Sequence, residues 1–224
     1  MRGTLWRAIH GPLMHRHFLP AQLPDDRPVA LFLRHAERPA ISDQSMGMHV
    51  PLTENGLADA RALGTHLGAR IVEARTSAIH RCVQTAAAIL EGAGSAVVVV
   101  EDPAIGVPST FITSGRESEK TIRELGFERF MQHLIDGDAV LPGLVHPGEG
   151  ARLMREHAIS ALTAKAGLHL FVSHDAMIGA LVARSWKEGL DDGGWPNFLE
   201  GAALWKDGAH TVLSYRQRCR AITG

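Results

Sequence analysis

The sequence predicts an α/β fold in three layers, α/β/α, with a mostly parallel central sheet. Apolar runs of strand length alternate along the chain with stretches of helical period, and the run from Val29 to Leu33 is apolar without interruption. A strand without polar alternation is typical of a parallel sheet that helices bury on both faces. The 224 residues suffice for one sizeable core, so we expect a single domain with an insertion.

The first part of the chain supplies the parallel strands of this prediction. After the strand at 29–33, Thr53 is a candidate N-cap for a helix whose apolar residues share one face. We expect a second strand at 70–74, a second helix at 81–90 and a short third strand at 96–101. This alternation of strands and helices is the pattern of a layered α/β domain.

Residues 102–150 break the alternation. Four prolines lie around a helical stretch at 117–135, which Gly126 interrupts. We interpret 102–150 as an inserted segment. Residues 1–27 show no clear period and are interpreted as an N-terminal arm, so the α/β domain is expected to span 28–224.

The alternation resumes after the insertion. We expect a helix at 151–166, a strand at 168–172, and a helix at 176–185 that is apolar nearly all round and therefore buried. A hairpin is expected to pair 202–205 with 211–215. Sheets of this class bind ligands beyond the carboxyl ends of their parallel strands, which is where functional residues are sought.

The composition excludes several classes of protein. A formal net charge of −1 gives no overall attraction to nucleic acid or anionic lipid. The two cysteines, Cys82 and Cys219, form no C-x-x-C pair, which argues against a disulfide framework or a thiolate zinc site. Every apolar run falls short of the roughly 20 residues of a membrane span, and no signal-peptide core is present. We expect a soluble, cytoplasmic protein with no nucleic-acid or membrane partner; the oligomeric state is left open.

Neither the N-terminal histidines nor the charged residues of the insertion indicate a binding site. His15-x-His17 has no companion ligands at a usable spacing, so no metal and no other cofactor is expected. Arg116, Lys120 and Arg123 lie on the helical stretch of the insertion, where a run of charges is usually a solvated face.

The first candidate segment follows the first strand. Arg34-His35-Ala36-Glu37-Arg38 places a histidine between two arginines at a strand end. The guanidinium fork matches phosphate oxygens, and a neutral imidazole can act as a nucleophile. Taken alone, the segment can equally be a structural histidine with solvated arginines.

Two further segments lie at a helix start and at a second strand end. Arg81 falls in the first turn of a predicted helix, beside unpaired N–H groups and the positive end of the helix dipole. Ser173-His174-Asp175 directly follows the strand at 168–172. His174 can donate to a phosphate oxygen, and Asp175 carries a carboxyl that can serve as a proton donor. Taken singly, Ser173 or Asp175 can also be a helix cap.

Together these segments resemble the histidine phosphatase superfamily, which includes the cofactor-dependent phosphoglycerate mutases and the histidine acid phosphatases. The resemblance covers residues 29 to about 216 and rests on Arg34-His35-x-Glu-Arg, Leu52-Thr53-x-x-Gly56, Arg81-Cys82-x-Gln84-Thr85-Ala86 and Ser173-His174-Asp175, in that order. It implies that His35 is transiently phosphorylated. The phosphate pocket that it implies consists of Arg34, His35, Arg81 and His174.

Two residues resemble the acid phosphatase branch in particular. Arg38 resembles its additional phosphate-binding arginine, and Asp175 resembles its proton donor. Ala36 departs from that branch, where glycine usually follows the nucleophile. Pro39 also departs from it, because it lies one place closer to the nucleophile than the proline of that branch. No Trp-Glu-Gly segment like that of the mutases is present. If the acid is a glutamate, as in the mutase branch, the candidates are Glu117, Glu119 and Glu101.

The resemblance implies a metal-independent phosphatase that hydrolyses phosphomonoesters through a phosphohistidine intermediate on His35. Asp175 is then the general acid, and Arg34, Arg38, Arg81 and His174 bind the phosphate. Two alternatives stay open: a phosphoglycerate-type mutase, and a non-catalytic domain that binds phosphorylated ligands. The expected partner is a small-molecule phosphomonoester. Its identity should depend on 102–150, the inserted segment that we expect to lie over the active site and to shape the substrate site.

Overall fold

The computed structural model describes residues 19–20, 22–41, 47–163, 165–190 and 194–222, and the account below concerns these residues. Most of the predicted N-terminal arm, including His15 and His17, lies outside them. Within the described part of the chain, no helix combines the length and the apolar character needed to cross a bilayer.

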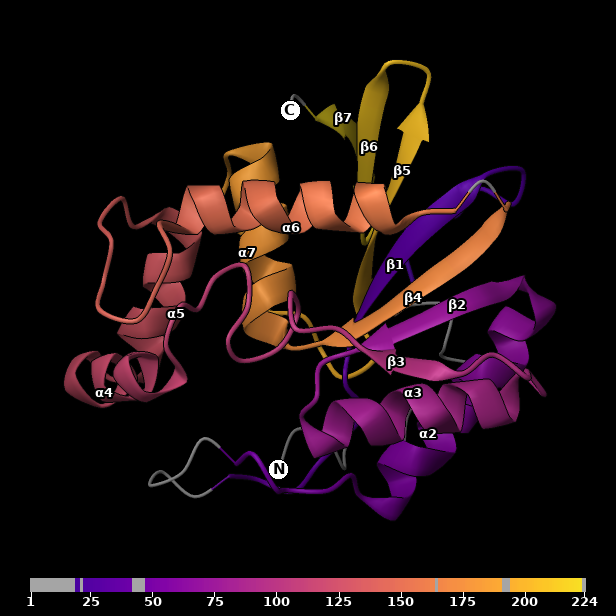
Figure 1. Ribbon diagram of the computed structural model, residues 1–224, viewed down its shortest axis with the longest axis horizontal. Helices are drawn as coiled ribbons and strands as arrows, with labels where there is room; N and C mark the ends of the chain where they lie inside the picture. Colours follow the sequence, from indigo (N-terminus) through magenta and orange to yellow (C-terminus); the bar gives the residue numbers. More distant parts are fainter. Residues whose placement is uncertain (1–18, 21, 42–46, 164, 191–193, 223–224) are drawn as a thin grey trace.

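A seven-stranded mixed sheet forms the centre of the molecule, in the order β3-β2-β4-β1-β5-β6-β7 (Figure 1). Its parallel part consists of β1 (Pro28–Arg34), β2 (Ile71–Thr76), β3 (Val99–Glu101) and β4 (Gly167–Ser173). Its antiparallel part consists of β5 (Gly201–Asp207), β6 (His210–Tyr215) and β7 (Arg218–Ile222). The predicted parallel strands and hairpin are confirmed, and β7 extends the hairpin by a strand that the sequence analysis did not predict.

Helices cover both faces of the sheet (Figure 1). On one face, α2 (Glu54–Leu67) and α3 (His80–Gly92) share a hydrophobic core with the sheet. On the other face, the core includes residues of α5 (Phe127–Asp136), α6 (Pro147–Ala161) and α7 (Asp175–Trp186). The α/β class predicted from the sequence is therefore confirmed, with helices on either side of the sheet.

Strand β1 supplies side chains to both cores. Val29, Leu31 and Leu33 face α2 and α3, whereas Ala30 and Phe32 face the opposite helices. All five side chains are fully buried, and each large one contributes about 1.5 to 3 kcal/mol relative to an exposed position. This double burial is the reason that the strand is apolar without alternation.

Glycines allow helices α2 and α3 to pack unusually closely. A Cβ atom at Gly64 would lie 1.9 Å from the carbonyl oxygen of Ile89, and one at Gly92 would lie 1.9 Å from that of Arg61. Because both neighbours are backbone atoms of the facing helix, a larger residue at either position would push the helices apart. The contact involves the last turns of α3, which runs from His80 to Gly92.

The segment 102–150 contains two helices, α4 (Gly115–Leu125) and α5, and leads into α6. Gly126 separates α4 from α5 with a φ of 80°, which confirms the predicted interruption. Helix α4 packs on α5, which packs on α7, so α4 lies at one end of the molecule (Figure 1). Helix α6 starts at Pro147 and ends at Ala161, whereas 151–166 was predicted. Proline fits the first turn of a helix, because the N–H that it lacks would have no partner within the helix at that position.

Candidate active site

The neighbouring ends of β1 and β4 bring together the candidate segments that begin at Arg34 and at Ser173. Strands β1 and β4 are paired in parallel, with Arg34 opposite Ser173. The backbone N–H of His35 donates to the carbonyl oxygen of Ser173 over 3.0 Å. The carboxyl ends of the two strands therefore coincide, and the rings of His35 and His174 lie 5.6 Å apart between centroids.

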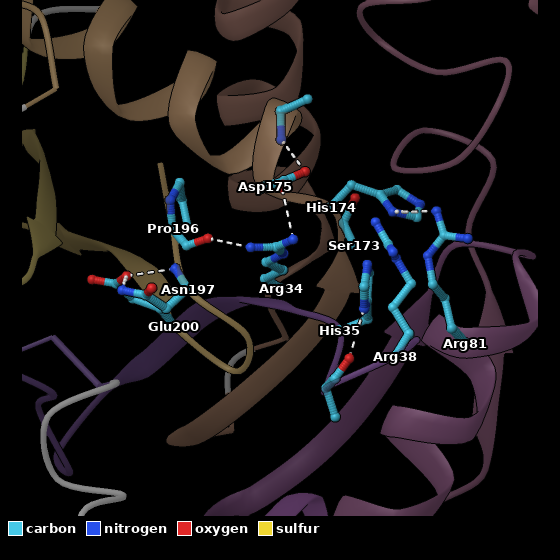
Figure 2. A network of polar contacts seen from close by, with 12 residues as sticks. Arg34, His35, Arg38, Arg81, Ser173, His174, Asp175, Pro196, Asn197 and Glu200 are labelled. Carbon is cyan, nitrogen blue, oxygen red and sulfur yellow. Dashed lines mark hydrogen bonds and ion pairs between the residues drawn. The ribbon is translucent and has the colours of Figure 1, made fainter. Parts of the chain in front are cut away.

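The first turn of α3 adds Arg81 to this pair. Its Nη2 lies 3.4 Å from Nδ1 of His174, and its Nη1 donates to the carbonyl oxygen of Gly47 over 2.7 Å. Figure 2 shows His35 between Arg34 on one side and, on the other side, Arg38, Arg81 and His174. Residues from three separate parts of the sequence thus surround one imidazole ring.

His35 is buried and neutral. Its Nδ1 lies 2.8 Å from the carbonyl oxygen of Ala36, and because a carbonyl oxygen can only accept, Nδ1 carries the ring proton. Burial, followed by electrostatic repulsion from His174 and then from Arg81 and Arg34, lowers the pKa of His35 to about 2. The other nitrogen, Nε2, therefore keeps a free lone pair at neutral pH and points away from Ala36 into the group of arginines (Figure 2).

His174 is held by protein partners on both ring nitrogens. Nδ1 faces Arg81, while Nε2 lies 3.4 Å from Oγ of Ser77 and 3.6 Å from Sγ of Cys82. Since a guanidinium can only donate, Nδ1 is the acceptor and Nε2 carries the proton. Burial first, and then the nearby arginines, lower the pKa of His174 to about 3, so this ring is also neutral.

Three arginines leave donors unused beside His35. In each of Arg34, Arg38 and Arg81 the Nε–H is buried and has no acceptor among the described protein atoms. Burial also lowers the pKa of each guanidinium. A buried donor without a partner costs about 1 to 3 kcal/mol, so an oxyanion that accepts from these groups is strongly favoured. The arrangement suits a phosphate group more than a neutral ligand.

Asp175 is paired with Arg34. Its Oδ2 lies 2.9 Å from Nη2 of Arg34, and its Oδ1 accepts the backbone N–H of Ala176 over 2.9 Å. His174, not Asp175, occupies the N-cap position of α7. The hydroxyl of Ser173 donates to the carbonyl oxygen of Ile105. The alternative that Ser173 or Asp175 is the N-cap of this helix is therefore wrong.

The other candidate acids lie in different surroundings. Glu101 and Glu117 are exposed, and Glu119 lies 3.9 Å from Arg123 on the outer helix α4. Of the carboxylates named from the sequence, Asp175 is the one that pairs with an arginine beside His35.

Contacts from the segment before β5 were missed by the sequence analysis. Arg34 donates from Nη1 to the carbonyl oxygen of Pro196 over 2.7 Å, and its guanidinium lies 4.3 Å from the ring centre of Phe198. The hydroxyl of Thr85 accepts the backbone N–H of Ala36 over 3.0 Å.

The family model described as histidine phosphatase superfamily (branch 1) matches residues 30–204. The chain belongs to the histidine phosphatase superfamily. The matching branch is branch 1. No curated protein matched the sequence.

Solved structures share the fold over nearly the whole domain. The mycobacterial glucosyl-3-phosphoglycerate phosphatase Rv2419c is similar with a TM-score of 0.56 and 19% identity, covering 87% of this chain and 96% of that chain. YhfR of Bacillus stearothermophilus is similar with a TM-score of 0.55 and 19% identity, covering 81% of this chain and 92% of that chain. At this identity the likeness establishes the fold alone.

Proposed function

We propose that this protein is a phosphatase that hydrolyses phosphomonoesters with His35 as the nucleophile. The observation that carries the proposal is the environment of Nε2 of His35. This nitrogen has a free lone pair because Nδ1 donates to Ala36, and the arginines around it keep buried donors without acceptors. A nucleophile and an oxyanion site therefore lie next to each other.

The reaction that this arrangement supports has two steps. In the first, Nε2 of His35 attacks phosphorus in line, the bond from phosphorus to the ester oxygen breaks, and Asp175, which must first take up a proton against its pairing with Arg34, protonates that oxygen. In the second, water attacks the phosphohistidine, gives its proton to the Asp175 carboxylate, and the bond from nitrogen to phosphorus breaks. His35 and Asp175 return to their starting states, and inorganic phosphate leaves.

The arginines are assigned to the phosphoryl oxygens, together with His174, which would donate its Nε2–H to a phosphoryl oxygen in place of its contacts with Ser77 and Cys82. Charge develops on these oxygens during transfer, and fixed guanidinium donors stabilise it. A metal ion supplies the same positive charge in many phosphoryl-transfer enzymes, so we propose that three arginines make it unnecessary here. The matching test is activity that persists in the presence of a chelator.

Fold relatives support a small phosphorylated substrate. The mycobacterial phosphatase Rv2419c, which acts on glucosyl-3-phosphoglycerate, has been solved with VO3 and with inorganic phosphate. We propose that this chain binds the same kind of phosphoryl group and that 102–150 is an insertion that selects the rest of the substrate. Cys82 and Cys219 are free thiols, which supports the proposal of a reducing, cytoplasmic compartment.

The decisive experiment compares the wild type with His35→Ala. The wild type is expected to release phosphate from p-nitrophenyl phosphate, and acid-labile phosphate should be trapped on His35. His35→Ala should lose at least about 10²- to 10³-fold in activity, the usual cost of removing one partner of the transition state. His210→Ala, at an exposed histidine of β6, serves as the matched control.

Assays of phosphoryl transfer between phosphoglycerates and of phosphate binding, made alongside this comparison, separate the alternatives. Full activity in His35→Ala would overturn the nucleophile assignment. Transfer of phosphate between phosphoglycerates, without release to water, would identify a mutase. Phosphate binding without turnover would identify a domain that only binds phosphorylated ligands.

A further inference from the structure

A tight turn before β5, formed by residues 196–200, contacts Arg34 on the side of His35 that lies opposite Arg81 (Figure 2). The turn is tied together by Glu200, whose side chain is nearly fully buried. The Glu200 carboxylate accepts the backbone N–H of Asn197 over 2.7 Å and its side-chain amide over 3.0 Å. It also pairs with Nε of Arg216 over 2.6 Å. A buried carboxylate with this many donors fixes the shape of the turn.

The turn is also joined to the backbone that carries the nucleophile. The N–H of Arg34 donates to the carbonyl oxygen of Glu200 over 3.0 Å, and the N–H of Leu199 donates to that of Arg34 over 3.2 Å. Leu199 has a φ of 60°, a left-handed conformation that a residue with a side chain adopts only when its surroundings enforce it. The position of the turn is therefore set relative to Arg34 and His35.

The turn holds the Arg34 guanidinium on several sides. The carbonyl oxygen of Pro196 accepts from Nη1, and Asp175 pairs with Nη2. The ring of Phe198 covers one face of the guanidinium at 4.3 Å and lies 5.6 Å from the ring of His35. The edge contacts occupy two nitrogens, and the face contact fixes the plane, so the unused Nε–H keeps one direction.

We propose that Phe198 is a positioning residue that orients Arg34 for the phosphoryl group, and that Glu200 anchors the turn that presents Phe198. This rests on the proposed function only in assigning Arg34 to phosphate binding. A cation over an aromatic face is stabilised by the ring quadrupole, and more strongly where water is excluded. Loss of the ring would let the guanidinium rotate and would weaken its contact with phosphate.

The test measures affinity for inorganic phosphate by calorimetry, which needs no turnover. Phe198→Leu keeps an apolar side chain but removes the ring, and should weaken phosphate binding by about 3- to 30-fold, the range of a cation–π contact. Phe198→Tyr keeps the ring and should stay within about twofold of the wild type. Equal affinity in Phe198→Leu and the wild type, or equal losses in both variants, would overturn the proposal.

A double-mutant cycle tests whether the effect passes through Arg34. In an Arg34→Lys background, which keeps a cation but loses the planar fork, Phe198→Leu should change phosphate affinity by less than about twofold. The same loss in both backgrounds would mean that Phe198 acts independently of Arg34, against the proposal.

Glu200→Gln tests the anchor. It should weaken phosphate binding in the same direction as Phe198→Leu, and the two losses should not add, because both act on one turn. The control is Glu188→Gln, which removes a carboxylate paired with Arg218 and Arg220 at the C-terminal strands and should leave the affinity unchanged. Wild type that binds phosphate but releases none from esters would refute the proposed function while leaving this inference standing.

Discussion

Nδ1 of His35 lies 2.8 Å from the carbonyl oxygen of Ala36, its immediate neighbour. The contact holds the ring in one tautomer and one orientation, because the carbonyl oxygen accepts only from a protonated nitrogen. The ring is thereby prepared to attack through Nε2 before any substrate binds. The side chain needs no separate base to remove a proton, unlike a serine nucleophile.

The tautomer of His35 predicts the chemical isomer of the intermediate. Phosphate should be found on Nε2, not on Nδ1, because Nδ1 is occupied by its hydrogen bond to Ala36. The measurement is rapid quenching of enzyme with labelled substrate, alkaline hydrolysis and separation of the two phosphohistidine isomers. Recovery of the Nδ1 isomer would mean that the imidazole ring flips before the attack, and it would contradict this orientation.

The two neutral histidines predict how stability depends on pH. Burial lowers the pKa from 6.5 to about 2 for His35 and to about 3 for His174. Between these values and 6.5 the unfolded chain binds protons that the folded chain does not. The contribution of the two histidines to the free energy of unfolding is therefore fully present above pH 6.5 and is lost as the pH is lowered. Each histidine should contribute a slope of up to about 1.4 kcal/mol per pH unit.

This slope can be measured by denaturant unfolding between pH 7.5 and pH 4.5. His174→Gln removes one titrating group and should flatten the curve, whereas His210→Gln, at an exposed position, should leave its slope unchanged. An unchanged slope in His174→Gln would show that the ring is protonated in the folded protein.

Local patterns in the sequence were sufficient to predict the parallel strands and the first helix. The apolar run at β1 reflects burial on both faces, and Thr53 caps α2 by accepting the N–H of Gly56 over 2.9 Å. Gly126 separates α4 from α5, as its conformational freedom predicted. Such features depend on residues that are close together in the chain, and sequence patterns report them directly.

Contacts made by the antiparallel part of the sheet were beyond sequence reasoning. Phe198 and Pro196 follow Arg34 by more than 160 residues, and they meet it because β5 pairs with β1. Nothing in the local pattern around Pro196 indicates which strand β5 will join. The pairing of Asp175 with Arg34 likewise depends on the register between β1 and β4.

The close approach of α2 and α3 predicts a large cost for a small substitution. Gly64→Ala adds a methyl group 1.9 Å from the carbonyl oxygen of Ile89, and overpacking of this kind costs about 1 to 3 kcal/mol. Alanine favours an isolated helix by about 1 kcal/mol, so a lowered melting temperature identifies the packing effect. Gly189→Ala is the control, because a Cβ atom there meets nothing within 4 Å. A raised melting temperature in Gly64→Ala would contradict the observed packing.

The pairing of Asp175 with Arg34 predicts a substrate-dependent effect of Asp175→Asn. An alkoxide needs a proton as its bond to phosphorus breaks, whereas a nitrophenolate leaves without one. The asparagine side chain would still accept the N–H of Ala176 but could not donate as an acid, so alkyl phosphates should slow by about 10²-fold or more. p-Nitrophenyl phosphate should slow much less, through the second step and the lost charge beside Arg34. Steady-state kinetics on glycerol phosphate and the aryl ester measure the difference.

Two comparisons decide whether Asp175 is the acid. Asp207→Asn removes a carboxylate that pairs with Arg27 at 2.8 Å far from His35, and should leave both substrates unaffected. If Asp175→Asn slows alkyl and aryl esters by the same factor, Asp175 acts only as a partner of Arg34, and the proton comes from another group. Substitution of Glu117, Glu119 and Glu101 by glutamine is then the next test.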